Sequence, residues 1–158
     1  MGLYRDGKEY RGVESVVIQK VRVEELKPMK KYLAITDEEN LKIILSKSIF
    51  GVTDRHLKNI HKLKKDDQII FYLKPKRIVA VFKVADSKIS NYIKWGEYIH
   101  QIRLEPKIIK NPVSLNTQFI DQLSYFRNKL WGPTLMGKAI LELPDSDWDK
   151  LQDLLREK

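Results

Sequence analysis

Short apolar runs separated by polar turns dominate the centre of the chain. The first run, Tyr32–Ile35, has the length and composition of a buried strand. Two longer runs flank the turn Lys74-Pro75-Lys76, and this order predicts an antiparallel hairpin with a basic tip. Strands are accordingly expected at 68–73 and 77–84 in the hairpin, and at 98–104 and 138–143 further along.

Helical spacing appears towards the two ends of this strand-rich centre. Thr36 and Glu39 have the spacing of a capping box, which predicts a helix over 37–47 that buries Leu41, Ile44 and Leu45. A basic stretch at 54–65 and the apolar positions of 119–126 are also expected to be helical. A final helix, capped by Asp145 or Ser146, buries a stripe that contains Trp148, Leu151, Leu154 and Leu155.

The segments between these elements are expected to be irregular. Residues 49–52 suggest a tight apolar turn, 86–97 a polar loop that contains Trp95, and 128–137 a loop rich in turn residues. Residues 1–30 differ from the rest, with a polar start, a β-branched run and Pro28. We expect them to form an extra strand or arm before a single domain over 31–158.

Composition narrows the class of protein. The chain contains 30 Lys and Arg residues and 21 Asp and Glu residues, which gives a net charge of +9. A pI near 9.6 fits a nucleic-acid-binding domain. It fits equally well the ion-rich surface of a heat-stable protein. The chain has no cysteine, which excludes disulfides and thiol catalysis and favours a cytoplasmic location. There is no apolar run of about 18 residues, so no membrane span is expected.

Catalytic motifs are absent from the sequence. Nucleotide-binding, zinc-protease and nucleophile-elbow patterns do not occur. The three histidines are His56, His61 and His100, and the first two are poorly spaced for a shared metal, so surface positions are expected for them. We therefore expect no metal, no cofactor and no enzymatic activity.

Five phrases, in their order and spacing, carry a family resemblance over residues 31–155. They are Leu33–Asn40, Ile49–Val52, Gln68–Tyr72, Ile78–Val84, and Arg127–Trp131 with Gly137–Ala139. Together they resemble the archaeal branch of the EVE domain family. The resemblance implies an α+β, PUA-like fold, a strongly bent β-barrel with flanking helices, related to YTH domains that read N6-methyladenine.

The implied function is recognition of a modified base in DNA or RNA. A flipped base needs two stacking faces and a polar group for its edge. Phe50 and Trp95 are the implied walls and Asn40 the implied edge reader. Each has a structural alternative: Phe50 as core, Trp95 as a lid on the barrel, and Asn40 as an exposed helix residue. The base-binding set predicted on these grounds is Thr36, Asp37, Asn40, Phe50, Gly51, Val52, Trp95 and Trp131.

The sequence also departs from the family pattern. Leu33, Leu41 and Phe50 stand where relatives often have Trp, and Lys65-Asp66-Asp67 replaces the usual Pro-Gly-Asp turn. The departures predict a weaker or differently tuned pocket. Trp131 could be a third wall or a structural plug, and Trp148 is assigned to the core.

Basic residues form three groups that could hold phosphates, because phosphate contacts supply affinity without reading sequence. The predicted phosphate-binding residues are Arg55, Lys58, Lys62, Lys74, Lys76, Arg77, Arg127 and Lys129. For any single lysine an ordinary solvated position is the alternative.

These features predict a non-enzymatic reader of methylated adenine or modified cytosine. The resemblance also suggests an association with modification-dependent restriction or RNA-modification machinery. Two alternatives stay open: a PUA-like module that binds tRNA or rRNA without reading a modified base, and a protein-interaction domain with an incidental basic surface.

Overall fold

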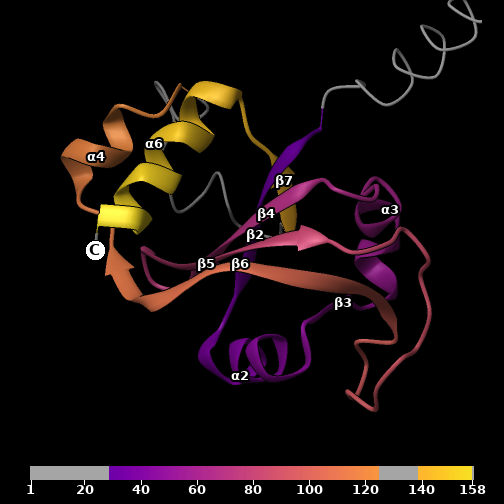
Figure 1. Ribbon diagram of the computed structural model, residues 1–158. Coiled ribbons are helices and arrows are strands. Elements are labelled where there is room, and N and C mark those ends of the chain that lie inside the picture. Colours follow the sequence, from indigo (N-terminus) through magenta and orange to yellow (C-terminus); the bar gives the residue numbers. More distant parts are fainter. Residues whose placement is uncertain (1–28, 125–138, 158) are drawn as a thin grey trace, which may run out of the picture.

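The computed structural model describes residues 29–124 and 139–157 (Figure 1). Strands and helices alternate along the first half, and a long strand and two helices follow. The elements are β2 (Lys31–Thr36), α2 (Glu38–Lys47), β3 (Ile49–Val52), η1 (Asp54–His56), α3 (Leu57–Ile60), β4 (Gln68–Leu73), β5 (Arg77–Val84), β6 (His100–Ser114), α4 (Thr117–Asp121), β7 (Ile140–Glu142) and α6 (Asp145–Glu157).

These strands form one six-stranded sheet in the order β3-β6-β5-β4-β2-β7. β2 pairs in parallel with β4, and the other neighbours are antiparallel. The register shifts once between β4 and β5, and twice between β5 and β6. Because bulges bend a strand and increase its twist, these shifts help curl the sheet.

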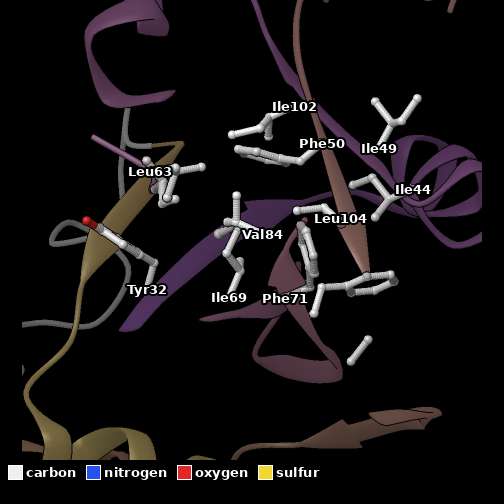
Figure 2. Close-up of a cluster of buried hydrophobic side chains, with 14 of the residues drawn as sticks. Tyr32, Ile44, Ile49, Phe50, Leu63, Ile69, Phe71, Val84, Ile102 and Leu104 are labelled. Carbon is white, nitrogen blue, oxygen red and sulfur yellow. The ribbon is translucent and has the colours of Figure 1, made fainter. Parts of the chain in front are cut away.

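The sheet is buried on both faces, so its central strands read as continuous apolar runs rather than alternating ones. In β4, Ile69 and Phe71 join one core cluster, whereas Ile70 and Tyr72 join the other. Helices α2 and α3 cover the first face, and α4 and α6 cover the second (Figure 1). Figure 2 shows part of the first cluster, where Phe50 and Phe71 meet with ring centroids 5.7 Å apart.

The predicted hairpin is confirmed, since β4 and β5 pair antiparallel around the Lys74-Pro75-Lys76 turn. The predicted turn at 49–52 is wrong, because these residues form β3 and pair with His100–Arg103 of β6. The predicted strand at 98–104 starts too early and stops too soon. β6 begins at His100 and continues to Ser114, which leaves Tyr98 in the preceding loop.

The predicted capping box that begins at Thr36 is also wrong. Asp37 is the N-cap, and its carboxylate accepts a hydrogen bond from the Asn40 N–H at 2.8 Å. Thr36 is instead the last residue of β2, paired with Leu73. Asp at an N-cap satisfies a free N–H as well as Thr does, so strand pairing decides which residue takes this position.

Helix α6 begins at Asp145 and buries Trp148, Leu151 and Leu155, which confirms the predicted apolar face. The short predicted strand appears as β7. The expected arm at 1–30 and the loop at 128–137 lie largely or wholly outside the described residues. Over 29–124 and 139–157, no helix has the length and apolarity needed to cross a membrane.

Candidate functional site

A cavity of about 260 Å³ lies where β2, α2, β3 and the 86–99 loop meet. Its lining combines apolar, amide, acidic and basic side chains with the aromatic rings of Phe50, Trp95 and Tyr98. The lining residues are Ile35, Thr36, Asp37, Asn40, Ile44, Phe50, Gly51, Val52, Thr53, Arg55, His56, Lys74, Trp95, Tyr98 and Ala139. Seven of the eight predicted base-binding residues are therefore together at one cavity, and Trp131 lies outside the described residues.

Asn40 connects the helix to the two aromatic residues of the loop. Its Oδ1 accepts a hydrogen bond from the Trp95 Nε1–H at 3.2 Å. Its Nδ2 donates to the Tyr98 hydroxyl at 3.1 Å and lies 3.5 Å from Asp37 Oδ2. The indole can only donate, so its bond fixes which end of the Asn40 amide is oxygen.

The local sequence explains why Asn40 faces inward. Asp37 ends the strand-to-helix turn and holds the Asn40 backbone N–H, which fixes the first turn of α2. Asn40 lies one turn before Ile44, so both side chains share the face directed at the cavity. Asn40 is thus a cavity residue and not an exposed helix residue.

Trp95 packs directly against the backbone of β3. A Cβ placed on Gly51 would lie 3.0 Å from Trp95 Cζ3 and 3.1 Å from both Trp95 Cε3 and Gln101 Cγ. Distances this short exclude a side chain at position 51 without displacement of a neighbour. Gly51 is therefore required for the indole to lie this close to the strand.

Gln101 holds the loop that carries Trp95. Its side chain is fully buried and bonds both the N–H and the carbonyl of Ile93, each at 2.9 Å. The same amide donates to the Tyr98 carbonyl at 2.6 Å. The Tyr98 N–H in turn donates to the Trp95 carbonyl at 2.9 Å. The loop between these points is consequently tied to β6 by side-chain and backbone bonds.

Phe50 differs from the expectation. Its side chain is 3% exposed, and its ring meets Phe71 edge-on inside the core (Figure 2). The structure thus gives it the core position that was the alternative, on the inner wall of the cavity. Its use as a stacking surface stays a prediction.

Two cationic side chains belong to the cavity lining. Arg55 comes from η1 and Lys74 from the turn after β4, and both side chains are exposed. The Lys74 turn is held in place because the Lys76 N–H donates to the Tyr72 hydroxyl at 2.8 Å and the Lys76 carbonyl accepts from Leu115 N at 2.7 Å. These two positive charges can contact the phosphates next to a bound base.

His56 is also in the cavity lining, whereas a position on the open surface was expected for it. Burial lowers the pKa of its imidazole below the ordinary value of 6.5, and the neighbouring Arg55 charge lowers it further. The neutral ring offers one donor and one acceptor at neutral pH. Its Nδ1 lies 3.4 Å from the Asn59 amide nitrogen, which leaves Nε2 for other contacts.

The other predicted phosphate-binding residues are placed differently. Lys58, Lys62 and Lys76 are exposed but do not line the cavity. Arg77 is half-buried, donates to the Lys74 carbonyl at 2.6 Å and pairs with Glu38 at 3.5 Å, so it has a structural role. Its phosphate-binding role stays a prediction. Arg127 and Lys129 lie outside the described residues.

Three residues that form or support the site were not predicted from the sequence. Tyr98 and His56 line the cavity, and Gln101 holds the loop of Trp95. Tyr98 begins an alternating apolar pattern, and this pattern predicts a strand there. The spacing Trp95-Gly96-Glu97-Tyr98 is a turn signal that could have corrected this, and Gly96 does adopt a left-handed backbone with φ of 53°. Gln101 carries no signal, because a buried amide looks like any polar strand residue.

The curled sheet with helices on both faces defines an α+β domain of the YTH-like fold. A YTH domain of Zygosaccharomyces rouxii, solved in complex with N6-methyladenosine RNA, superposes with a TM-score of 0.63. The match covers 82% of this chain and 86% of the YTH chain at 11% sequence identity. The predicted fold class is therefore confirmed.

Sequence comparison then gives the family. A UPF0310 protein of Pyrococcus abyssi is 31% identical over 143 residues, covering 80% of this chain and 100% of the relative. A second UPF0310 protein, from Pyrococcus horikoshii, is 25% identical over 141 residues, covering 78% of this chain and 97% of that protein. The chain belongs to the UPF0310 family. No family model matches the sequence.

Proposed function

We propose that this UPF0310 chain is an EVE-type reader that binds a modified base, turned out of DNA or RNA, in the cavity beside Asn40 and Trp95. The observation that carries the proposal is the hydrogen bond from the Trp95 indole to the Asn40 amide at the cavity. It joins a large aromatic surface to an amide of fixed polarity, and a flipped base needs both kinds of group.

The charges support nucleic acid as the partner. Arg55 and Lys74 line the cavity, and the chain has a net charge of +9. Phosphate contacts then position the strand, while the cavity reads the base. The YTH domain with the same fold was solved with N6-methyladenosine RNA, which supports a base as the occupant. In this proposal the protein binds and does not catalyse, and it acts in the cytoplasm beside modification-dependent restriction or RNA-modification machinery.

A second candidate is an RNA-binding module that does not read a modified base. It is favoured by one observation, that only 9% of Trp95 is exposed. A nearly covered indole offers little stacking surface to a base in this arrangement. The two candidates differ in whether a single modification changes the affinity.

A binding panel tests the proposal. The full chain is titrated at fixed salt with DNA and RNA oligonucleotides that each carry one modified base, beside their unmodified parents. We expect a preference for one modified member. Trp95→Ala and Asn40→Ala should remove that preference but keep the weaker, salt-dependent binding. Asn91→Ala is the matched control, since Asn91 is exposed and does not line the cavity. Equal affinity for every pair would contradict modified-base reading.

Salt dependence tests the role of the cations. The logarithm of the binding constant should fall with the logarithm of salt concentration by about 0.7 for each phosphate contact on a single strand. Arg55→Ala and Lys74→Ala should each reduce this slope by roughly that amount. Lys107→Ala, exposed on β6 and away from the cavity lining, should leave the slope unchanged. Equal slopes in all chains would exclude Arg55 and Lys74 as phosphate contacts.

A further inference from the structure

Trp95 has no open ring face in the structure. The indole is 9% exposed, and its six-membered ring packs on the Gly51 backbone. The Tyr98 ring covers it as well, with centroids 4.9 Å apart and ring planes 30° apart. Rings this close leave no room for a base between them, because two stacked contacts require about twice the separation of one. A base can stack on this side of Trp95 only where Tyr98 now lies.

Tyr98 makes both contacts that the proposed function assigns to a base. Its ring stacks on Trp95, and its hydroxyl accepts the hydrogen bond of Asn40 Nδ2 at 3.1 Å. A flat aromatic body with an acceptor at its edge is also the description of a nucleobase. The Tyr98 side chain thus takes up both the stacking surface of Trp95 and the hydrogen-bonding amide of Asn40.

The surroundings of Tyr98 let its side chain leave without unfolding the loop. Its backbone is held at both ends, by the Trp95 carbonyl at 2.9 Å and by the Gln101 amide at 2.6 Å. The side chain itself is only half-buried, and its two neighbours on the N-terminal side, Gly96 and Glu97, are exposed. Rotation about the Cα–Cβ bond therefore frees Trp95 and Asn40 while every backbone hydrogen bond of the loop stays in place.

We propose that Tyr98 is a built-in competitor for the base site, which the incoming base must displace from Trp95 and Asn40. This inference rests on the proposed function and gives that site a new affinity-determining residue. A closed state raises every dissociation constant by the same factor, the reciprocal of the fraction of open protein. Tyr98 therefore lowers the affinity for modified and unmodified bases alike. Only ligands with a high intrinsic affinity then bind, and the ratio of the affinities for modified and unmodified bases is unchanged.

The size of the effect follows from the contacts that are broken. An aromatic pair and a neutral hydrogen bond together hold Tyr98 closed, which corresponds to about a fivefold to hundredfold penalty on affinity. Tyr98→Ala removes both contacts and should tighten binding within that range. Tyr98→Phe keeps the ring and loses the bond to Asn40, so it should tighten binding by a smaller factor.

The test uses the full chain and two pairs of nine-nucleotide probes. One pair is RNA with a central N6-methyladenosine or adenosine, and the other is DNA with a central 5-methylcytosine or cytosine. Tyr98→Ala should raise the affinity for both members of the pair that binds, by the same factor. Tyr92→Ala is the control, since Tyr92 belongs to the same loop but does not line the cavity. If Tyr98 were instead a second wall of the base site, Tyr98→Ala would weaken binding, and that result or an unchanged affinity would overturn the proposal.

A measurement without nucleic acid separates this inference from the proposed function. The chain has three tryptophans, so its indole N–H signals are few, and the Trp95 signal is identified by its loss in Trp95→Phe. A soluble nitroxide should broaden this signal more strongly in Tyr98→Ala than in the unmodified chain or in Tyr92→Ala. If no chain binds any probe while the broadening increases, the proposed function fails and the cover on Trp95 is supported. Unchanged broadening would overturn the cover itself.

Discussion

Replacement of Gly51 by Ala probes the closest contact in the site. The added methyl group would lie 3.0 Å from Trp95 Cζ3 and 3.1 Å from Gln101 Cγ, so a neighbour must move by several tenths of an ångström. Gln101 is held by three hydrogen bonds to the loop, whereas Trp95 is held by one, to Asn40. The indole is therefore the group expected to move, and its bond to Asn40 should lengthen or break.

The stability cost follows from overpacking and the lost bond. Extra methyl groups in a packed core cost about 1–3 kcal/mol, and a neutral hydrogen bond contributes about 0.5–1.5 kcal/mol. At about 2–4 °C for each kcal/mol in a domain of this size, Gly51→Ala should lower Tm measurably. Thermal denaturation gives the stability, and the chemical shift of the Trp95 indole N–H reports on its bond to Asn40.

Gly96→Ala is the matched control for the same methyl group. A Cβ at Gly96 meets no atom within 4 Å, but the backbone there has φ of 53°, which costs about 1–2 kcal/mol for a side chain in the left-handed region. Both variants should therefore lose stability, while only Gly51→Ala should shift the indole signal. An unchanged Tm and an unchanged indole signal in Gly51→Ala would refute the close-packing argument.

Three further perturbations test the supports of the site and of the fold. Gln101→Leu removes three hydrogen bonds to backbone groups of the loop, so the free energy of unfolding should fall by about 1–3 kcal/mol and amide hydrogen exchange in the 86–99 loop should become faster. Unchanged exchange would contradict the role of Gln101 as the anchor of the loop. Asp67→Ala leaves the backbone N–H groups of Lys30 and Lys64 without their buried acceptor, so the free energy of unfolding in urea should fall by about 1–3 kcal/mol. Asp149→Ala, on the exposed side of α6, is the control and should have no effect. Equal effects of the two substitutions would contradict the role of Asp67 as a buried acceptor. His56 has a lowered pKa in the fold, so its contribution to stability is complete above 6.5 and is lost as the pH falls below it. Between pH 7 and about pH 5, His56→Gln should therefore lose less stability than the unmodified chain. His61→Gln, at an exposed position, is the control. Parallel curves of stability against pH for His56→Gln and the unmodified chain would contradict the lowered pKa of His56.

The strands that the sequence predicts well are those whose apolar run matches their pairing. The 68–73 and 77–84 runs are bounded by an unmistakable turn, and both become strands of the expected length. The burial of Trp148 was predictable too, since helical spacing places it with Leu151 and Leu155. Local pattern and tertiary packing agree at these positions, so local reasoning suffices.

The errors fall where pairing with a distant segment overrides the local pattern. Ile49–Val52 has only four residues and includes Gly51, so its local pattern does not distinguish a strand from a turn. Its pairing with β6 makes it a strand. Thr36 matches a capping motif, but the parallel pairing of β2 with β4 extends through it to Leu73. Sequence periodicity contains no information about such partners.

The candidate site shows the same division. Family resemblance selected residues that do meet at one cavity, although Asn40 and Trp95 are 55 positions apart. It did not supply Gln101, which holds the loop of Trp95, because this side chain bonds backbone atoms that almost any loop presents. It also implied a stacking wall at Phe50, whose ring packs edge-on against Phe71 in the core.

The register of β3 on β6 links the fold to the site. β3 has only four residues, so its ladder hydrogen bonds are too few to fix the register alone. Successive side chains of a strand point to opposite faces, so Phe50 enters the core while Gly51 faces Trp95 across from Gln101. A slip of one residue would place Phe50 or Val52 opposite Gln101, against an indole that already leaves no room for a methyl group. The same slip would also withdraw Phe50 from Phe71. The pairing that completes the core is therefore the pairing that leaves space for Trp95, and a stable fold and an assembled site require the same register.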